Sequence, residues 1–528
     1  MDLGTTDKHI STQKPLKQLI QQIGLRTSDT DGDVLITGIA LDSRRVRPGN
    51  LFVALSGGNA DGHAYIAEAV GQGAAAVVGS KPITGMEVPY FQVGNGRWAL
   101  AQLAAAFYDF PVRQLTVIGV TGTDGKTTTA NLIYHILRSA GLRAGMISTV
   151  NARIGEEVID TGFHVTTPEA PDVQRYLADM VAAGLTHVVL EVTSHGLKQR
   201  RVSGCEFDIG VITNITHEHL DYHGTYEGYR ASKARLLTEL AYTPTKNHHP
   251  PRFAVLNRDD ASFEYLNEIT EVASITYAVH AAADLRAANI THSWRGLAFD
   301  VSGKSRQFPV SSSLVGQYNV YNCLAAIATT VEGLGISPEA AQEGIAALKS
   351  IPGRMEVIDL GQDFRAIVDF AHTPNALKRA LETVRQLSTG RVIAVFGSAG
   401  LRDRAKRRMM AETSAEMADL IVLTAEDPRT ESLDKILAEM GAGAESRGGV
   451  EGKSFWRIPD RGEAIRFALS LAQPEDVVMA CGKGHEQSMC FGETEYPWDD
   501  RIAMRAALAE YLQIPGPRMP YLPTQDDD

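Results

Sequence analysis

The sequence predicts an α/β protein of three domains, and three observations lead to this prediction. The chain has 528 residues, several times the roughly 150 residues that are common for a single domain. Two long stretches alternate short β-branched apolar runs with segments of helical spacing, a pattern typical of parallel sheets covered by helices. Hydrophobic residues make up 44% and charged residues 22%, close to the average for folded globular proteins.

Residues 1–113 are expected to form a small mixed α/β N-terminal domain. Apolar runs near residues 34–38, 51–55 and 74–78 predict strands, and residues 64–70 predict a helix.

Residues 114–350 are expected to form a central domain with a doubly wound sheet. The run LTVIGV at 115–120 predicts a buried strand, and 126–141 predicts a helix that ends near Gly141. Further strands are predicted at 186–192, 208–215 and 253–257.

Residues 351–528 are expected to form a C-terminal domain after a linker at Pro352 and Gly353. Strands are predicted at 364–370, 391–397, 420–426 and 476–482, with helices from Pro374, through Met409 and near 462–472. This second alternation predicts a Rossmann-like doubly wound sheet. The proline-rich end at 515–528 is predicted to be a surface tail.

The composition excludes several classes of protein. A net charge of −12 and a pI near 5.7 argue against a general nucleic-acid binder. The four cysteines lack ligand-like spacing, so they are expected to be reduced thiols of a cytoplasmic protein. Since no run of about 18 apolar residues occurs, no membrane insertion is expected.

A glycine-rich segment between a predicted strand and a predicted helix points to phosphate binding. GVTGTDGKTTT at 119–129 lets backbone N–H groups close around a phosphate, with Lys126 reaching the terminal phosphates and Thr127 ligating Mg²⁺. Val120 stands where the strict spacing has glycine, so this is a variant loop of a P-loop-type domain. The alternative is a glycine-rich turn with an exposed lysine.

Polar residues after the next two strands are candidate metal ligands. Glu191 ends one strand, and TNITHEHLDYHGT at 213–225 follows another with a cluster of histidines. One imidazole beside Glu191 suits a nucleotide-bound Mg²⁺ or Mn²⁺ ion, while the cluster alone also suits zinc. A capping or surface role for Glu191, structural roles for the single histidines and a solvated Lys233 are the alternatives from the residues alone.

Several further motifs occur in a fixed order along nearly the whole chain, and together they resemble the Mur ligase family. They are DSRRVRPGNLFVAL, GGNADGH, TGTDGKTTT, TTPEA, EVTSHGLKQRRV, TNITHEHLDYHG, LVGQYNVYNCLAA, PGRME, VDFAHTPNAL and GKGHE. The N-terminal block and GKGHE are similar to the branch that adds the third residue of the peptidoglycan peptide.

The resemblance implies an ATP-dependent, ADP-forming, amide-forming ligase of peptidoglycan and cell wall synthesis. It implies that a diamino acid is joined, through an acyl phosphate, to the γ-carboxyl of D-Glu in UDP-N-acetylmuramoyl-L-alanyl-D-glutamate. It further implies a cytoplasmic enzyme that needs ATP and Mg²⁺, or Mn²⁺, and we expect a monomer that binds no nucleic acid.

The resemblance also assigns residues to ligands. It implies ATP contacts at Gly122, Thr123, Asp124, Gly125, Lys126, Thr127, Thr128, Asn319, Arg354 and Asp369. It implies UDP-muramoyl-dipeptide contacts at Leu41, Ser43, Gly58, Asn59, Ala60, Thr166, Thr167, Thr193, Gln199 and Arg201. Catalytic roles fall to Lys126, Lys233, Glu191 and His219, and metal ligation to Thr127, Glu191, His219 and a carbamylated Lys233.

Two positions depart from the family's pattern, and one residue is modified by implication. Val165 and Asp124 stand where the family has asparagine, and we expect the Asp124 carboxylate to face a cation or backbone N–H groups. The neutral amine of Lys233 would react with CO₂ to give a carboxylate on a long stem, which can reach a second Mg²⁺.

The incoming amino acid is implied to bind a separate set of residues. That set is Arg402, Glu426, Asp427, Pro428, Arg429, Gly482 and Glu486. The guanidiniums of Arg402 and Arg429 fit the extra carboxylate of meso-2,6-diaminopimelate. Glu426 and Asp427 replace the family's Asp and Asn, and the added negative charge favours L-lysine or L-ornithine instead. Diaminopimelate is ranked first, and the distant alternatives are a P-loop NTPase switch and a non-catalytic UDP-sugar-binding homologue.

Overall fold

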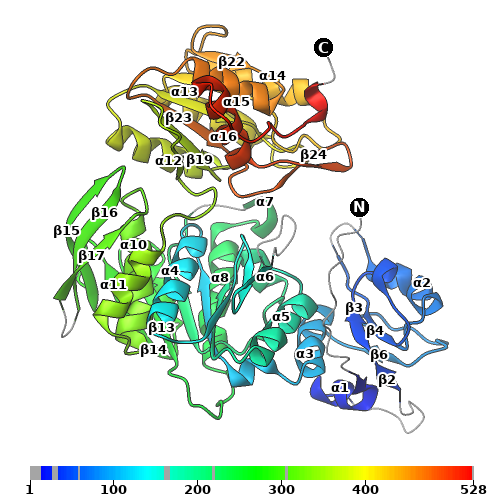
Figure 1. Ribbon diagram of the computed structural model, residues 1–528. Coiled ribbons are helices and arrows are strands. Elements are labelled where there is room, and N and C mark those ends of the chain that lie inside the picture. Colours follow the sequence, from blue (N-terminus) through cyan, green and yellow to red (C-terminus); the bar gives the residue numbers. More distant parts are fainter. Residues whose placement is uncertain are drawn as a thin grey trace. The chain divides into compact units, whose positions relative to one another are not determined.

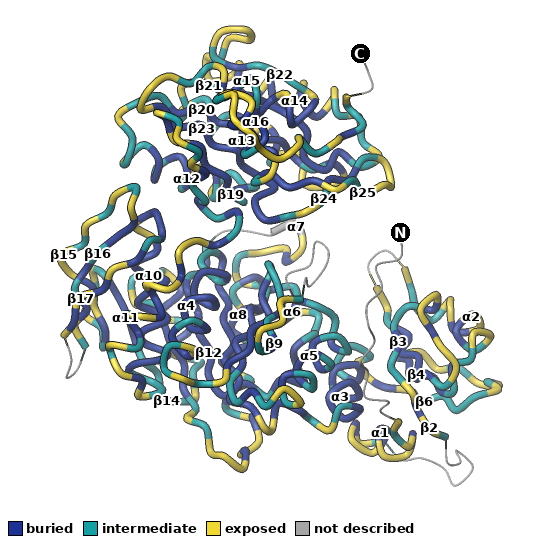
Figure 2. The backbone as a smooth tube through the Cα atoms, in the orientation of Figure 1, coloured by how far each residue is buried: buried dark blue, intermediate teal, exposed yellow. Residues whose placement is uncertain are grey.

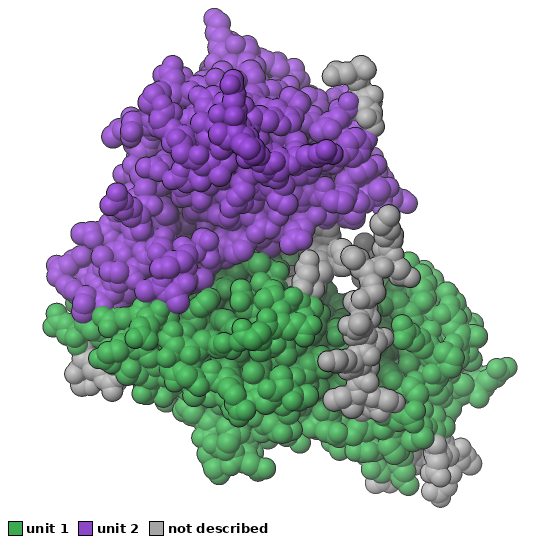
Figure 3. Space-filling model, viewed as in Figure 1, with its two compact units in different colours: residues 1–287, 301–308, 321–345 green, residues 288–300, 309–320, 346–528 purple. Residues whose placement is uncertain are grey.

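The computed structural model describes residues 13–25, 34–57, 60–159, 167–216, 220–303 and 307–525, and it divides into two compact units. Unit 1 contains residues 1–287, 301–308 and 321–345, and unit 2 contains residues 288–300, 309–320 and 346–528 (Figure 3). Figure 1 shows the helices and strands of both units, coloured along the chain.

The N-terminal part of unit 1 contains a four-stranded parallel sheet with strands in sequential order. Its strands are β3 (Gly38–Ala40), β4 (Asn50–Val53), β5 (Ala76–Gly79) and β6 (Tyr90–Gln92), with α2 (Ile66–Gly71) between β4 and β5. Before and after it lie β1 (Lys14–Pro15), α1 (Leu16–Gln22), β2 (Leu35–Ile36) and α3 (Gly96–Phe107). The single strand predicted at 34–38 is wrong, because β2 pairs with β1 whereas β3 pairs with β4 in another sheet.

The central sheet of unit 1 places β7 (Thr116–Thr121) in the middle of parallel strands. Its order is β10-β9-β8-β11-β7-β12-β13-β14, continued by β15, β16 and β17, whose residues are divided between the units. The strands are β8 (Ala144–Ile147), β9 (Ala152–Ile154), β10 (Glu157–Ile159), β11 (His187–Glu191), β12 (Ile209–Ile212), β13 (Phe253–Asn257), β14 (Ala273–Ala278), β15 (Leu285–Ser293), β16 (Gly296–Ser302) and β17 (Gln307–Ser312). Every residue of β7 is buried, as expected for a strand with both faces covered. Figure 2 shows the buried, intermediate and exposed residues along the backbone of both units.

The helices of this region follow the predicted pattern. They are α4 (Lys126–Ser139), α5 (Ala170–Ala182), α6 (Ser194–Lys198), α7 (Leu220–His223), α8 (Tyr226–Leu240), α9 (Phe263–Glu268), α10 (Asn319–Ile327) and α11 (Pro338–Ala347), with a π-helical turn at Ala328–Gly333. Helix α4 ends as predicted: Gly141 has a φ of +77°, and Leu142 N donates to Leu137 O at 3.0 Å.

The register of the central strands brings three segments to one edge of the sheet. Glu191 lies opposite Val120 on one side of β7, and Ile212 lies opposite Thr121 on the other. The residues that follow β7, β11 and β12 therefore leave the sheet side by side. The strand predicted at 208–215 ends at Ile212, so its last residues belong to this edge.

Unit 2 is built on a six-stranded sheet of order β18-β19-β23-β20-β21-β22. Its strands are β18 (Glu356–Ile358), β19 (Arg365–Asp369), β20 (Val392–Phe396), β21 (Leu420–Leu423), β22 (Phe455–Arg457) and β23 (Val477–Cys481). On one face pack α12 (Pro374–Leu387), α13 (Ala405–Met417) and α14 (Leu433–Glu445). On the other pack α15 (Arg461–Ser470) and α16 (Asp500–Leu512), and a hairpin of β24 (Ser488–Phe491) and β25 (Thr494–Pro497) lies between β23 and α16 in the chain.

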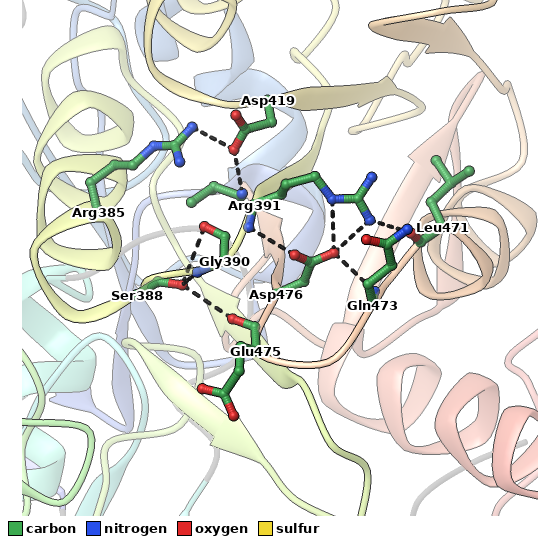
Figure 4. A network of polar contacts seen from close by, with 10 residues as sticks. Arg385, Ser388, Gly390, Arg391, Asp419, Leu471, Gln473, Glu475 and Asp476 are labelled. Carbon is green, nitrogen blue, oxygen red and sulfur yellow. Dashed lines mark hydrogen bonds and ion pairs between the residues drawn. The ribbon is translucent and has the colours of Figure 1, made fainter.

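The amino ends of β20 and β23 are tied by an ion pair. Figure 4 shows the Arg391 guanidinium facing the Asp476 carboxylate, to which Nη2 donates at 2.6 Å and Nε at 3.1 Å. Nη2 also donates to Leu471 O, and the backbone N–H of Gln473 donates to the Asp476 carboxylate. This network fixes the loops at the end of the sheet where each strand begins.

Three further expectations concern the tail, the cysteines and the membrane. The predicted surface tail is wrong in part, because Leu522 is fully buried against α15 and α16 and Thr524 Oγ1 donates to Asp460 at 2.7 Å. All four cysteines are buried and free of disulfides, as predicted. Among the described residues, every helix is too short or too polar to cross a lipid bilayer.

Candidate functional site

The loop between β7 and α4 has two positions that admit only glycine. A Cβ on Gly122 would lie 1.8 Å from Thr213 Oγ1, and one on Gly125 would lie 2.2 Å from Asn322 Oδ1. Gly125 also has a φ of +80° and immediately precedes α4. The first-turn amides of α4 have no acceptor within the helix, so this loop presents N–H groups suited to an anion.

The loop is held by residues that follow β12. Thr123 N donates to Asn214 O at 2.7 Å, and Asp124 N donates to Asn214 Oδ1 at 3.0 Å. Thr213 Oγ1 donates to Asp124 O at 2.6 Å. The sequence analysis did not assign roles to Thr213 and Asn214; the signal was their place directly after a predicted strand. The direction of the Asp124 carboxylate stays a prediction.

Glu191 is a buried carboxylate against the first turn of α4. Only 3% of the residue is exposed, Thr127 Oγ1 donates to its Oε1 at 3.0 Å, and Thr149 N donates to its Oε2 at 3.0 Å. These contacts rule out a surface acid. They bring two hard oxygen donors together beside the loop, the type of ligand that Mg²⁺ prefers.

Two lysines meet the same loop. Lys126 Nζ donates to Thr123 O at 2.7 Å, and Lys233 Nζ in α8 donates to Gly122 O at 2.5 Å. Lys233 is 1% exposed, and its Nζ lies 4.7 Å from the ring centroid of Tyr229. The solvated surface lysine that the residues alone suggested is therefore wrong for Lys233, since the helix α8 carries it into the interior.

Four predicted dipeptide-binding residues form one cluster. The hydroxyls of Thr167 and Thr193 lie 3.1 Å apart, and Arg201 Nη1 donates to Thr167 O at 2.7 Å. Arg201 Nε donates to Gln199 Oε1 at 3.1 Å, and Arg201 pairs with Glu169 at 2.8 Å. The cluster presents hydroxyl, amide and guanidinium groups, which suit a carboxylate-bearing peptide.

A three-residue segment links this cluster to the loop. Glu191 contacts Thr127, and Thr193, two residues further along the chain, contacts Thr167. Two residues of extended chain span about 7 Å. The predicted phosphate-binding and dipeptide-binding groups of unit 1 are therefore neighbours.

The histidine cluster contributes one buried structural residue to the described part of the chain. The ring nitrogens of His223 pair with Ser194 Oγ at 3.1 Å and Ser232 Oγ at 3.2 Å. Within the described ranges no group of three metal-ligating side chains occurs. His219, like Gly58, Asn59 and Thr166, lies outside the described residues.

Three predicted sugar-binding residues lie in the N-terminal part of unit 1. Ser43 is buried and its Oγ donates to Glu68 at 2.9 Å. Leu41 is half-buried, and Ala60 is exposed, with its carbonyl accepting from Gly57 N at 3.0 Å. These contacts hold the Ser43 side chain and the Ala60 backbone in place, and they assign no ligand to either residue.

In unit 2, two glycine-containing motifs meet. A Cβ on Gly353 of PGRME would lie 2.1 Å from Gly484 C of GKGHE. Arg354, next to this contact, stacks over Phe370 at 4.5 Å, and the Asp369 carboxylate accepts from Met355 N at 2.7 Å. The fold thus brings together Arg354 and Asp369, two of the predicted nucleotide contacts.

His485 and Asn319 are two further buried residues of unit 2. Burial, with nearby Arg354, lowers the pKa of His485 to about 3, so its ring is neutral at pH 7. Asn319, at the start of α10, is buried and its Nδ2 donates to Val315 O at 2.8 Å.

Glu426 is the most unusual of the predicted amino-acid-binding residues. It is 6% exposed, and its Oε2 is buried without a hydrogen-bond partner in the part of the chain that the structure describes. A Cβ on Gly482 would lie 2.6 Å from that atom, so the glycine makes room for it. Burial, partly offset by Lys406 and Arg461, raises the pKa of Glu426 to about 7.

Asp427 and Glu486 share a buried cation that the sequence analysis missed. Lys483, fully buried, pairs with Asp427 at 2.9 Å and with Glu486 at 2.5 Å. Cys490 N donates to the same Asp427 oxygen at 3.0 Å. The signal was available, because Lys483 is the lysine of GKGHE.

The remaining residues of the set lie on two adjoining loops. Gly400 N donates to Asp427 O at 3.0 Å, and a Cβ on Gly400 would lie 2.0 Å from Pro428 O. Arg402 follows in an exposed stretch, and Arg429 is half-buried with its Nε lacking a partner among the described residues. Arg402 and Arg429 therefore lie on two loops whose backbones adjoin at Asp427 and Pro428, the residues that follow Glu426.

Sequence comparisons cover most of the chain. The Mur ligase family catalytic domain matches residues 35–108, the Mur ligase middle domain matches residues 120–330, and the Mur ligase glutamate ligase domain matches residues 353–484. The chain is 46% identical to UDP-N-acetylmuramyl-tripeptide synthetase of Roseiflexus sp. (strain RS-1), over 90% of this chain and 95% of the relative. It is 42% identical to UDP-N-acetylmuramoyl-L-alanyl-D-glutamate--2,6-diaminopimelate ligase of Geobacillus kaustophilus, over 91% and 96%.

Comparison with solved structures also finds Mur ligases. A UDP-N-acetylmuramoyl-L-alanyl-D-glutamate--2,6-diaminopimelate ligase matches with a TM-score of 0.64 and 30% identity, over 94% of this chain and 100% of the other. The MurF ligase of Thermotoga maritima, solved with ADP, matches with a TM-score of 0.57 and 20% identity, over 84% and 93%, which shows a shared fold. With its three-domain α/β architecture and these matches along its length, the chain belongs to the Mur ligase family.

Proposed function

We propose that the protein is an ATP-dependent ligase that joins meso-2,6-diaminopimelate to the γ-carboxyl of D-Glu in UDP-N-acetylmuramoyl-L-alanyl-D-glutamate. The observation that carries the proposal is the segment 191–193, in which Glu191 contacts the phosphate loop and Thr193 contacts the Thr167 cluster. A nucleotide on the loop and a peptide carboxylate on the cluster would be neighbours. Relatives named for this reaction, identical at 42% and 41%, support it.

The reaction requires a better leaving group than oxide. The acceptor carboxylate attacks the γ-phosphorus of ATP, which forms a C–O–P bond, breaks the bond to ADP and gives an acyl phosphate. The amine of the diamino acid then attacks the acyl carbon, inorganic phosphate leaves, and the amine loses a proton. Lys126 and the first-turn amides of α4 stabilise the phosphate charge.

The ATP-binding set proposed from the family motifs is residues 122–128 with Asn319, Arg354 and Asp369. Thr127 and Glu191, together with His219 and a carbamylated Lys233, are the proposed ligands of Mg²⁺, which would neutralise phosphate charge when bound. Their buried oxygens, 3.0 Å apart for Thr127 and Glu191, support this assignment. A carbamate on Lys233 keeps one N–H, so its hydrogen bond to Gly122 O can persist.

The dipeptide and sugar contacts are likewise proposed from the motifs, with Thr167, Thr193, Gln199 and Arg201 around the peptide. We further propose domains at residues 1–113 for the UDP-sugar, 114–350 for ATP and 351–528 for the amino acid. The separate sheets of these ranges support the division.

Diaminopimelate is favoured over lysine and ornithine by the charges around Glu426. The negative charge of Asp427, which favoured a substrate ending in a free ammonium, is opposed by Lys483 at 2.9 Å. The raised pKa of Glu426 reduces its charge near neutral pH. The guanidiniums of Arg402 and Arg429 thus remain to attract a second carboxylate.

One incubation tests the proposal. Purified protein is mixed with ATP, UDP-N-acetylmuramoyl-L-alanyl-D-glutamate and equal amounts of diaminopimelate, lysine and ornithine, and products are identified by mass spectrometry. We expect the diaminopimelate adduct with one ADP per amide. A lysine or ornithine adduct overturns the amino-acid choice; ATP turnover without an amide indicates an NTPase, and precursor binding alone indicates a non-catalytic homologue.

A further inference from the structure

Arg461 and Asp500 form a fully buried ion pair beneath the loops that carry the proposed amino-acid-binding residues. Both residues are 0% exposed. Arg461 Nε donates to Asp500 Oδ1 at 2.7 Å and Nη2 donates to Oδ2 at 2.6 Å, a two-point contact. Trp498 Nε1 donates to the same carboxylate at 2.9 Å.

The remaining donors of Arg461 reach two backbone carbonyls. Nη1 donates to Ala425 O at 3.1 Å, and Nη2 donates to Cys481 O at 2.8 Å. These residues directly precede Glu426 and Gly482. Cys481 is the last residue of β23, and Ala425 lies two residues beyond the end of β21.

One carbonyl ends β23 and the other lies in the loop that follows β21, and these two strands do not pair with each other. Both β21 and β23 pair with β20, on its opposite sides. Arg461 therefore ties together two loops across the carboxyl end of a third strand. Only the guanidinium has a planar fork of N–H groups that can hold a carboxylate and two carbonyls at once; an ammonium on a lysine stem has three donors at one point.

The position of Glu426 depends on this spacing. Its Oε2, which has no hydrogen-bond partner among the described residues, would lie 2.6 Å from a Cβ on Gly482, so a small change in the distance between the two loops would change the space around this oxygen. A buried ion pair is a weak source of stability, because desolvation offsets the Coulomb attraction. Its four directed hydrogen bonds point instead to a geometric role.

We propose that Arg461, oriented by Asp500, is a positioning residue that sets the distance between the Glu426 and Gly482 loops and thereby the affinity for the incoming diamino acid. This inference rests on the proposed function for its link to the amino acid. The loop geometry itself is independent of that function and is tested separately.

The test uses Arg461→Lys in the full-length protein, with two measurements. Hydrogen exchange with mass spectrometry reports the protection of peptides covering residues 424–430 and 481–486. Steady-state kinetics reports KM for diaminopimelate, for ATP and for the UDP-linked dipeptide. We expect faster exchange in both peptides and a KM for diaminopimelate raised about tenfold or more, since misplacement by about 1 Å is costly at an active site. The KM for the UDP-linked dipeptide should change less than about twofold, because Arg461 contacts none of its proposed residues. The KM for ATP should rise less than that for diaminopimelate, because Arg461 reaches the proposed ATP contact Asp369 indirectly, through the hydrogen bond from Gly482 N to Asp369 O at 3.1 Å.

The matched control is Arg391→Lys, the same change in an ion pair at the amino ends of two strands of the same sheet (Figure 4). Arg391 is outside the proposed site, so its variant should leave all three KM values and the two peptides unchanged. An equal rise in KM for diaminopimelate in both variants would show a general loss of order and overturn the inference.

The outcomes separate the inference from the function. Unchanged exchange in Arg461→Lys overturns the positioning role whether or not the protein is a ligase. Faster exchange with an unchanged KM for diaminopimelate overturns the link to the amino acid. A parent protein that forms no amide refutes the proposed function, and with it this link, while exchange still decides the loop geometry.

A second variant covers the case in which Arg461→Lys does not fold. The double variant Arg461→Met with Asp500→Leu fills the space with apolar groups, a replacement that buried ion pairs often tolerate. It removes both carbonyl contacts, so the same rise in exchange and in KM is expected. If this variant folds and shows the same exchange rates and the same KM for diaminopimelate as the parent protein, the inference is overturned.

Discussion

The phosphate loop of unit 1 and the loops near Glu426 in unit 2 reach left-handed backbone conformations with different residue types. In the phosphate loop of unit 1 the left-handed position is a glycine, Gly125 at a φ of +80°. In unit 2 the loops near Glu426 place side chains at such positions: Leu401 at +56°, Asp427 at +40° and Arg429 at +55°. Each non-glycine residue there costs about 1 kcal/mol or more.

The difference follows from what each loop has to present. A phosphate loop works through backbone N–H groups, and a side chain at Gly122 or Gly125 would collide with Thr213 or Asn322. A loop that recognises an amino acid works through its own carboxylates and guanidiniums. At Asp427 and Arg429 a glycine would remove the proposed binding group, so the fold bears the strain there, and the contact of Lys483 with Asp427 helps to hold it.

The largest expected effect comes from Lys126→Ala. Loss of a cation at the terminal phosphates should lower kcat/KM about 1000-fold, the scale of removing one transition-state donor. Urea unfolding should be unchanged within error, because Lys126 is half-buried and its Nζ donates to the carbonyl of Thr123, in the same loop. The exposed Lys17→Ala serves as control and should keep full activity. An active Lys126→Ala protein contradicts the phosphate role.

The next largest effect is expected from a substitution of Gly122 in the phosphate loop of unit 1. Gly122→Ala places a Cβ 1.8 Å from Thr213 Oγ1 and should lower the free energy of unfolding by about 3 kcal/mol, as overpacking does. Gly155, with a φ of +64° and no atom within 4 Å of an added Cβ, gives the control. Gly155→Ala should cost only about 1 kcal/mol from backbone strain. Equal losses in urea titrations would show that the Thr213 contact is unimportant.

Lys233→Ala tests the proposed carbamate. We expect about a 100-fold loss of kcat/KM, typical of losing a group that supports a metal site. Added formate or acetate should restore part of the rate if a carboxylate is what is missing. The Lys233→Arg variant, which keeps a cation but cannot form a carbamate, should stay inactive and gain nothing from these anions, because the guanidinium occupies the space that they would need. Full activity of Lys233→Ala without rescue rejects the assignment.

The smallest expected effect is a pH dependence of stability that comes from Glu426 in unit 2. The pKa of Glu426 rises from 4.5 to about 7 on folding, so the native state binds its proton more tightly than the unfolded state. Stability is therefore lost as pH rises between these values, and the loss is complete above pH 7. The Glu426→Gln variant has no carboxyl at this position, so it should not show this pH-dependent loss of stability.

Relative to the parent, Glu426→Gln should gain about 2 kcal/mol of unfolding free energy between pH 5 and pH 8, since one pKa unit corresponds to about 1.4 kcal/mol. Urea titrations at several pH values measure this difference. The exposed Glu445→Gln should show no such trend. A flat difference for Glu426→Gln would mean that the carboxyl is ionised throughout.

Local patterns in the chain were sufficient for the elements that carry the phosphate loop. The strand at 116–121, the helix from Lys126 and its end before Gly141 follow from apolar periodicity and from glycine's access to positive φ, which depend on adjacent residues only. The order of the motifs was enough to recognise the Mur ligase family.

Tertiary structure decided what each polar side chain does. The contact of Lys233 with Gly122 joins residues 111 positions apart, and that of Lys483 with Asp427 joins residues 56 apart. No local spacing encodes such pairs, and the pKa of Glu426 depends on a burial that only packing creates. The sequence by itself determined the elements and the family, whereas charge state, partner and depth of each site residue arose from long-range packing, because electrostatic energies depend on distance in space and on access to water.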